Sequence, residues 1–160
     1  MRIVLTADHA GVDLKGELAA WLAEQGHDIL DLGTNSHESV DYPRYGAMLA
    51  EALADGRAER GITVCGSGIG VAIAANRNPA CRCAQVAEPL SAALARQHNE
   101  CNAIAIGARL IGVDAGSIGF CGSTVIGRGS RRAGFRRRHL RSTQPVACAR
   151  SARGMPVDRH

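Results

Sequence analysis

Residues 61–70 read Gly-Ile-Thr-Val-Cys-Gly-Ser-Gly-Ile-Gly, and residues 71–75 continue as Val-Ala-Ile-Ala-Ala. An apolar β-branched run ends at Cys65, a glycine-rich turn follows, and a helix can begin after it. A strand that leads through such a turn into a helix presents backbone N–H groups and a positive helix end to an anion. The same helix end favours the thiolate form of a nearby cysteine. The stretch therefore predicts a base beside a set of oxyanion donors.

The same residues are also compatible with a tight strand-to-helix turn around a small buried thiol. Glycine permits sharp turns, and free cysteine is among the most buried residue types. A nucleotide-binding P-loop is excluded, since no Gly-Lys-Ser/Thr follows. A dinucleotide-binding loop is disfavoured, because Val71 stands where the third glycine of G-x-G-x-x-G belongs. This stretch alone leaves catalysis and simple packing as alternatives.

Length and composition predict one folded domain with a sizeable core. The chain has 160 residues, of which 46% are apolar, and because only 3% are aromatic the core must consist of Ala, Val, Ile and Leu. No apolar run is long enough to cross a membrane, and the first residues enter a strand pattern without the layout of a signal peptide. We therefore expect a cytoplasmic protein.

The cysteines indicate reduced thiols. They stand at positions 65, 81, 83, 101, 121 and 148, with one C-x-C pair and no C-x-x-C pair. This spacing is typical of neither a zinc site nor the disulfide framework of a small secreted domain. We expect no bound metal, and free thiols in a reducing compartment.

The charge divides the chain into two parts. Residues 1–114 carry nine Lys and Arg against fourteen Asp and Glu, a net charge of −5, whereas residues 115–160 carry ten Arg and one Asp, a net charge of +9. The second part also loses the strand and helix pattern. We therefore expect an acidic α/β domain over 1–114 and an irregular basic tail over 115–160. A frameshift is one hypothesis for this abrupt change, and resequencing the gene would test it.

Strand and helix patterns alternate along the first part. We expect strands at 2–7, 27–32, 61–65, 79–86 and 102–107, helices at 12–25, 45–53, 71–76 and 88–98, a loop at 41–43 and a further element from 108. This alternation predicts a doubly wound, Rossmann-like fold: a five-stranded parallel sheet with helices on both faces. Ligands bind such sheets at the carboxyl ends of the strands. At that edge we expect Asp8, His9, Cys65, His98 and Asn99.

Several short motifs follow one another in the first part of the chain: Asp-His-Ala-Gly at 8–11, Gly-Thr at 33–34, Val-Asp-Tyr-Pro at 40–43, Cys-Gly-Ser-Gly-Ile-Gly at 65–70, Ala-Ala-Asn-Arg at 74–77, Ser91, Arg-Gln-His-Asn at 96–99, Asn102 and Ala-Ile-Gly-Ala-Arg at 105–109. In this order and spacing they resemble the type B ribose-5-phosphate isomerases, in the family that also holds the galactose-6-phosphate isomerase subunits. Each motif is weak alone, but together they are highly specific through about residue 114.

The resemblance implies an aldose–ketose isomerase that interconverts D-ribose 5-phosphate and D-ribulose 5-phosphate without a metal or organic cofactor. Cys65 would be the base that moves a proton between C2 and C1 through an enediolate. The turn that follows it would stabilise the enediolate oxygens with the N–H groups of Gly66, Gly68, Ile69 and Gly70. The family also implies a homodimer or homotetramer with active sites at the subunit interface.

The resemblance further implies roles for side chains outside this turn. His98 would handle the protons that open the furanose ring, with Ser67 near it. Asp8 and Tyr42 would contact the sugar hydroxyls and the ring oxygen. Contacts with substrate or phosphate are implied for the remaining matched residues, His9, Asn99 and Arg109.

These residues also have purely structural interpretations. Asp8 can cap a helix, Tyr42 can pack its loop, and Arg109 can be a solvated charge. His98 and Asn99 can form an ordinary exposed helix end. The residue types alone leave both interpretations open.

The chain departs from the family after about residue 114. The family continues with a helix and a phosphate-binding segment of the Glu-Gly-Gly-Arg-His type, which is missing from this sequence. Counted without gaps, Arg132 and Arg136 fall where the family has its phosphate-binding arginines, although their surroundings differ. Arginine suits bidentate phosphate contacts, so both are candidates for substrate binding.

Three other functions remain alternatives. One is an isomerase of galactose 6-phosphate or allose 6-phosphate. Another is an inactive family member, which folds but no longer catalyses the reaction because its phosphate-binding segment is missing. The third is a binding module whose basic tail contacts nucleic acid in a salt-dependent way. Nucleic acid is disfavoured because the tail has only two aromatics, Phe120 and Phe135, which leaves little platform for stacking bases.

Overall fold

The computed structural model describes residues 1–111. The predictions for the basic tail over 115–160, for the domain boundary at 114 and for Arg132 and Arg136 lie outside the described residues. Within residues 1–111 the longest helices have 13 residues, and none of the helices is long and apolar enough to cross a bilayer.

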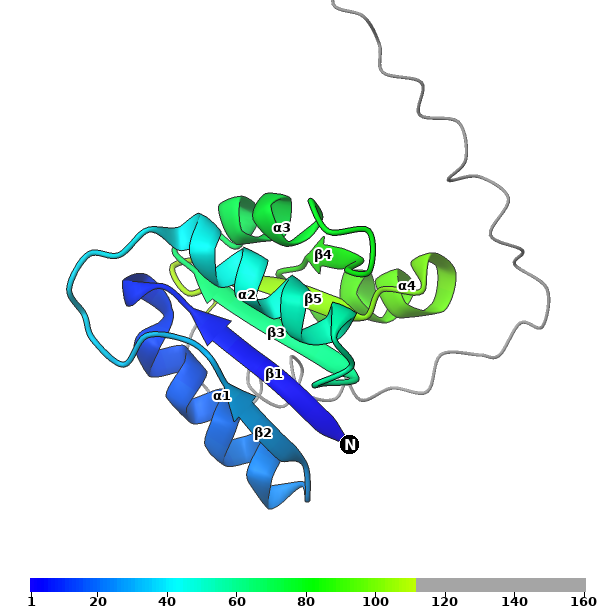
Figure 1. The fold of residues 1–160 in the computed structure, drawn as a ribbon, viewed down its shortest axis with the longest axis horizontal. Coiled ribbons are helices and arrows are strands. Elements are labelled where there is room, and N and C mark those ends of the chain that lie inside the picture. The colour runs from blue at the N-terminus through cyan, green and yellow to red at the C-terminus, as the bar shows by residue number, and fades with distance from the viewer. Residues whose placement is uncertain (112–160) are drawn as a thin grey trace, which may run out of the picture. The chain divides into compact units, whose positions relative to one another are not determined.

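Five parallel strands form one sheet in the order β2-β1-β3-β5-β4 (Figure 1). Their bounds are β1 (Arg2–Ala7), β2 (Asp28–Asp31), β3 (Arg60–Cys65), β4 (Cys83–Gln85) and β5 (Ala103–Gly107). The chain first moves from β1 to one side, to β2, and then returns to the other side with β3. The sheet therefore has its topological switch point between β1 and β3, where α/β folds form their ligand crevices.

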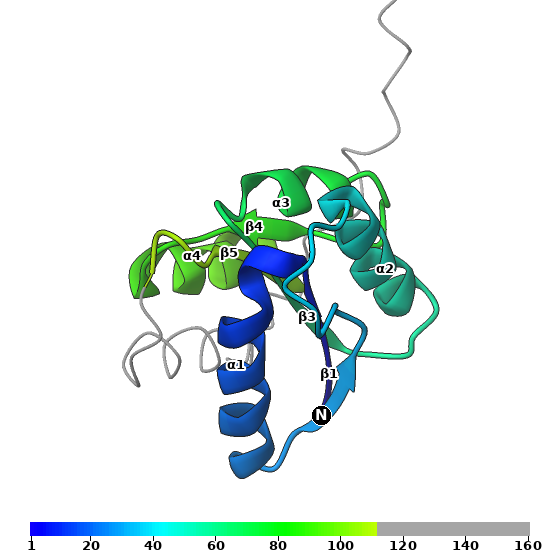
Figure 2. The ribbon, with the colours of Figure 1, turned by 90° about the vertical axis from the view of Figure 1, so that its left-hand side faces the viewer.

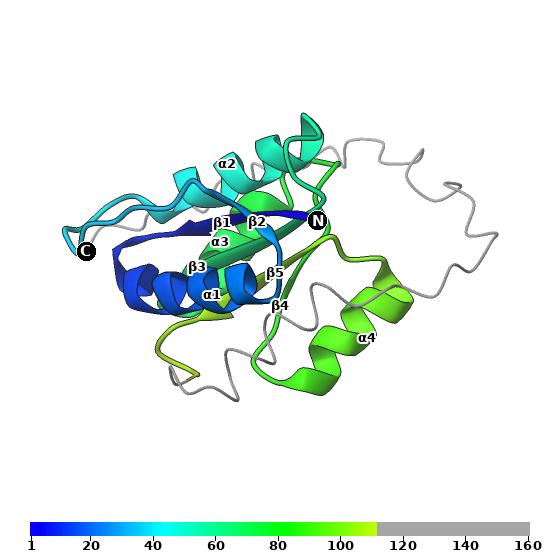
Figure 3. The same ribbon diagram turned by 90° about the horizontal axis from the view of Figure 1, so that it is seen from below.

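Helices cover both faces of this sheet, as the alternating pattern predicts. They are α1 (Val12–Glu24), α2 (Tyr42–Ala54), α3 (Ile69–Ala75) and α4 (Pro89–Asn99), with a single 3₁₀ turn, η1 (His9–Gly11), before α1. Figure 3 shows α1 and α4 on one side of the sheet and α2 on the other, and Figure 2 shows α1 and α2 on opposite sides of β1. The expected Rossmann-like α/β class is confirmed.

Alternating strand residues supply the two halves of the core. Ile3 and Leu5 of β1 pack with Leu18 of α1 on one face, whereas Val4 packs with Leu49 of α2 on the other. All five side chains are fully or almost fully buried. Burying a side chain of this size stabilises the fold by about 1.5–3 kcal/mol. Because successive residues of β1 point to opposite faces of the sheet, this one strand stabilises the packing of helices on both faces.

Two expected boundaries are wrong by three residues or more. Helix α2 begins at Tyr42 rather than at residue 45. Pro43 is tolerated there because the N–H groups of the first helical turn have no acceptor within the helix, so a proline costs no hydrogen bond. Strand β4 begins at Cys83 rather than at residue 79. The preceding residues form a turn, in which Asn78 accepts hydrogen bonds from the N–H groups of Ala80 and Cys81.

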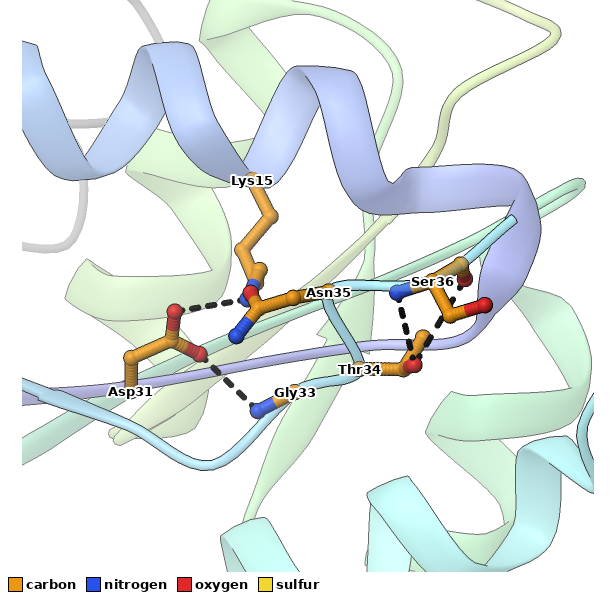
Figure 4. A network of polar contacts seen from close by, with 6 residues as sticks. All are labelled: Lys15, Asp31, Gly33, Thr34, Asn35 and Ser36. Carbon is orange, nitrogen blue, oxygen red and sulfur yellow. Dashed lines mark hydrogen bonds and ion pairs between the residues drawn. The ribbon is translucent and has the colours of Figure 1, made fainter. Parts of the chain in front are cut away.

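A buried lysine ties helix α1 to the segment that follows β2 (Figure 4). The Nζ atom of Lys15 donates to Oδ2 of Asp31 at 2.6 Å and to Oδ1 of Asn35 at 2.8 Å. The second carboxylate oxygen of Asp31 accepts the N–H of Gly33 at 2.9 Å. A buried ammonium group requires such partners. These bonds fix the direction in which the chain leaves β2.

Candidate functional site

A pocket of about 670 Å³ opens at the carboxyl ends of β1 and β3. Three parts of the chain line it: residues 8–10 after β1, residues 65–67, 69 and 70 from the end of β3 onward, and residues 109–110 after β5, together with Tyr42 and Ile73. Its volume falls in the range of small-molecule sites, about 300–1,000 Å³. The pocket lies at the switch point of the sheet, so topology and cavity indicate the same ligand site.

Cys65 is the last residue of β3 and lines this pocket. Only 5% of the residue is exposed, and its Sγ atom accepts a hydrogen bond from the N–H of Gly68 at 3.1 Å. The structure thus places the sulfur at the glycine turn.

Each glycine of the turn allows a different neighbour to approach. Gly68 has a φ of 77°, and a Cβ there would stand 2.9 Å from the backbone of β5, so a side chain is excluded on both counts. A Cβ on Gly66 would stand 3.3 Å from the guanidinium of Arg109, and one on Gly70 would stand 2.5 Å from the ring of Tyr42. The glycines therefore let two substrate-binding candidates lie against the turn.

The turn also retains free donors. The N–H groups of Ser67 and Gly70 donate to no other described residue, whereas that of Ile69 donates to Oγ of Ser67 at 3.3 Å. The first N–H groups of a helix have no partner within the helix. Ser67 and Gly70 both line the pocket. Their amides are thus available to a ligand oxygen.

Asp8 and His9 reach the pocket from the loop after β1. Oδ1 of Asp8 accepts the N–H of Ala10 at 2.9 Å, so the interpretation of Asp8 as a cap is correct, and the cap is the one of η1. His9 is held through Nδ1, which accepts the N–H of Val40 at 3.3 Å. The same loop therefore offers a carboxylate and an imidazole to one cavity.

Arg109 is the one Lys or Arg among the described residues that line the pocket. It follows β5, and its backbone N–H donates to the carbonyl of Gly66 at 3.1 Å. This bond joins the segment after β5 to the glycine turn. The guanidinium thereby stands beside the turn, where it can receive an anionic group of a ligand.

The structure does not bring His98 and Asn99 to this pocket, so their expected place at the carboxyl edge is wrong for a single chain. They end α4, and Nε of Arg82, just before β4, donates to the carbonyl of Asn99 at 2.6 Å. A helix that connects two parallel strands returns the chain to their amino ends. Figure 1 accordingly shows α4 on the side away from the arrowhead of β1. Both side chains are exposed there.

Sequence reasoning missed three lining residues, which are Ala10, Ile73 and Leu110. Ile73 and Leu110 are each 59% exposed, and Ile69, one helical turn before Ile73, is 54% exposed. The i, i+4 spacing of the two isoleucines was visible in the sequence. It did not distinguish an apolar pocket rim from a core face.

The cysteines with shifted pKa values lie away from the pocket. Hydrogen bonding to Cys81 and burial raise the pKa of Cys83 well above its ordinary value, and burial raises the pKa of Cys101. The bond with Cys83 lowers the pKa of Cys81. Among residues 1–111, no group of three His, Cys, Asp or Glu side chains is placed to hold a metal ion.

Comparison with known proteins identifies relatives of the whole described region. The family described as Ribose/Galactose Isomerase matches residues 3–117. Ribose-5-phosphate isomerase B of Escherichia coli is 43% identical over 113 residues, which cover 71% of this chain and 76% of that protein. The galactose-6-phosphate isomerase subunit LacB of Clostridium acetobutylicum is 34% identical over 113 residues, covering 71% of this chain and 65% of that protein.

A solved structure shares the fold. The ribose-5-phosphate isomerase B of Clostridium thermocellum superposes with a TM-score of 0.77 at 38% identity, over 81% of this chain and 86% of that one. The sheet order, the switch-point pocket and these matches agree with the motifs around Cys65. The chain is therefore an isomerase that belongs to the ribose/galactose isomerase family.

Proposed function

We propose that this enzyme interconverts D-ribose 5-phosphate and D-ribulose 5-phosphate, with Cys65 as the base. The observation that carries the proposal is the hydrogen bond from Gly68 to Sγ of Cys65 within the switch-point pocket. The identity to ribose-5-phosphate isomerase B of Escherichia coli supports this choice of substrate.

The reaction is a proton transfer between neighbouring carbons. The Cys65 thiolate removes the proton from C2 of the open-chain aldose, and the C–H electron pair forms the C1–C2 double bond of an enediolate while O1 gains negative charge. A proton then passes from the O2 hydroxyl to O1, which moves the negative charge to O2. The O2 electron pair forms the new carbonyl at C2 while the C1–C2 π pair takes the proton from the Cys65 thiol at C1, and the thiolate is restored. A general base contributes about 10²–10⁴-fold, and one oxyanion donor about 10²–10³-fold.

The free amides of the turn suit the oxygens of this intermediate. Ser67 and Gly70 carry N–H groups without a described partner, beside the sulfur that takes the proton. Preorganised donors stabilise charge that develops during the reaction. We assign the N–H groups of Ser67 and Gly70 to the enediolate oxygens on this ground, because those of Gly68 and Ile69 already donate to Cys65 and Ser67.

The remaining lining residues would hold the substrate. Asp8 and Tyr42 would contact the sugar hydroxyls and the ring oxygen. Arg109, the lining cation, would contact the phosphate, since guanidinium groups bind phosphate oxygens in pairs. Arg132 and Arg136 stay predictions for the same role.

A second copy of the chain would complete the site. His98 and Asn99 lie at the opposite edge of the sheet, and the pocket carries an exposed apolar rim of Ile69, Ile73 and Leu110. An exposed apolar rim around a pocket is typical of an interaction surface. We infer that a homodimer brings His98 of one subunit to the Ser67 side of the other subunit's pocket. There His98 would move the protons that open the furanose ring.

Replacing the sulfur tests the assignment. Cys65→Ala should lower kcat for ribose 5-phosphate isomerisation by about 10²–10⁴-fold, because the base is lost. Cys101→Ser is the matched control, since Cys101 lies at the far edge of the sheet, just before β5, and it should keep wild-type turnover. Undiminished activity of Cys65→Ala, with retained circular dichroism, would reject the assigned base.

Another sugar phosphate is the second candidate substrate. The match to a galactose-6-phosphate isomerase subunit favours galactose 6-phosphate, and allose 6-phosphate has the same aldose chemistry. A panel of the three phosphates, compared by kcat/KM, separates these candidates. A higher kcat/KM for either hexose phosphate would replace ribose 5-phosphate in the proposal.

A further inference from the structure

One nitrogen of the His9 ring is hydrogen-bonded within the protein, and His9 also lines the pocket. Its Nδ1 atom accepts the backbone N–H of Val40 at 3.3 Å, and Val40 is not among the lining residues. A neutral imidazole has one donor and one acceptor nitrogen. Since Nδ1 accepts, the proton of the neutral ring must lie on Nε2.

We propose that the backbone N–H of Val40 holds His9 as the Nε2–H tautomer, so that His9 presents a hydrogen-bond donor to a substrate oxygen. In this tautomer the ring offers the pocket no free acceptor nitrogen, so His9 does not act as a base there. Val40 is a positioning residue that acts through its main chain. The identity of the substrate rests on the proposed function, whereas the tautomer does not.

The segment that carries Val40 is fastened at both ends. At its start, Lys15 binds Asp31 and Asn35, as Figure 4 shows. At its end, Val40 stands two residues before Tyr42, the first residue of α2. These attachments locate the Val40 N–H independently of its own side chain.

The donor suits the oxygens of a sugar phosphate. A neutral N–H can pair with a phosphate, carbonyl or hydroxyl oxygen, and its bond is stronger when the oxygen is charged. Arg109, across the same pocket, supplies the positive charge. His9 can therefore orient a substrate oxygen through its N–H group without adding a second proton acceptor beside Cys65.

The tautomer is measured directly in the free full-length protein. A two-bond ¹H–¹⁵N spectrum of the histidine rings, with His9 assigned by its loss in His9→Gln, should show a pyridine-type Nδ1 and a pyrrole-type Nε2 at neutral pH. A pyrrole-type Nδ1, or averaged shifts for both nitrogens, overturns the proposal. Because no substrate is present, this result stands even if the enzyme fails to isomerise ribose 5-phosphate.

Removing the Val40 donor tests its positioning role. Val40→Pro lacks the N–H and should move the two ring shifts toward each other and raise KM about tenfold with a smaller change in kcat. Val40→Ala keeps the N–H and should retain the wild-type ring shifts. Wild-type ring shifts in a folded Val40→Pro protein overturn the role assigned to Val40.

A second pair of variants tests the donor if Val40→Pro does not fold. His9→Gln retains an N–H near the position of Nε2, whereas His9→Met fills a similar volume without a donor. The KM of His9→Gln should be at least about tenfold lower than that of His9→Met. Equal KM values for these two variants overturn the donor role.

Discussion

Gly70 controls where the ring of Tyr42 can lie. A Cβ at this position would stand 2.5 Å from the ring, which is closer than real side chains approach. Gly70→Ala should therefore displace Tyr42 and raise KM for the sugar phosphate several-fold, with a smaller effect on kcat. Steady-state kinetics of the purified variant measure both constants.

Gly16→Ala is the matched control for this substitution. Gly16 lies in α1, and a Cβ there meets no atom within 4 Å. The variant should be more stable by about 0.5–1 kcal/mol, because alanine loses less entropy in a helix, and its KM should stay at the wild-type value. An unchanged KM in Gly70→Ala as well would contradict the assigned contact between Tyr42 and substrate.

At this scale the sequence predicted the strand end at Cys65 and the glycine turn after it, but not the neighbours of the turn, and the role of Cys65 as base stays a prediction. The strand, Cys65 and the glycines lie within ten residues, so local patterns were sufficient. The contacts of Gly66 with Arg109 and of Gly70 with Tyr42 join segments that are distant in sequence. Such contacts depend on how loops from different strands meet, which no local pattern records.

Helix α4 begins with a carboxylate cap that makes its stability depend on pH. Glu88 accepts the N–H groups of Leu90 and Ser91, each at 2.6 Å. The hydrogen bonds with Ser91 hold the pKa of Glu88 below its ordinary value of 4.5. A carboxyl group whose pKa falls on folding stabilises the native state when ionised. Its contribution is present above pH 4.5 and is lost as the pH falls through the folded-state pKa.

Replacing Glu88 should consequently lower the stability only at pH values at which its carboxylate is charged. Glu88→Gln should lower Tm at neutral pH, and the difference from the wild type should shrink when the pH falls well below 4.5. Thermal melts at several pH values measure this difference. Glu17→Gln, an exposed position in the middle of α1, should change Tm little at either pH. A Tm loss that is equal at all pH values would contradict the capping role of Glu88.

Among the elements, types were easier to predict than bounds and directions. All five strands and four helices were expected, because the apolar periods are clear. The predicted start of α2 is wrong because the first helical turn tolerates Pro43, whereas a proline further along would end a helix. The predicted edge for His98 is wrong because a helix between two parallel strands returns the chain to their amino ends.

For the whole molecule, the separation of His98 from the pocket predicts complementation between subunits. Cys65→Ala and His98→Ala should each have little activity alone. In a mixed dimer, the pocket with an intact Cys65 receives an intact His98 from the other subunit. Random mixing should restore roughly a quarter of wild-type activity, because half of the dimers are mixed and each has one intact site of two.

Coexpression of two differently tagged chains gives the random mixture. Tandem purification then isolates the mixed dimers, which should show about half of wild-type activity because one of their two sites is intact. Mixing two preparations of the same variant is the control and should restore nothing. Recovery would also require the dimer that the apolar rim predicts. Activity that remains absent in purified mixed dimers would show that His98 has no role across the interface.

The parallel pairing of every strand has a consequence for how the enzyme acquires its site. Among residues 1–111 no strand pairs through a hairpin, so each strand pair forms only after an intervening helix has packed on the sheet. Long-range closures of this kind slow folding. Cys65 gains its neighbour Gly107 only when β5 docks against β3. During refolding, the time at which this thiol becomes protected from alkylation should therefore mark the formation of the pocket between β1 and β3.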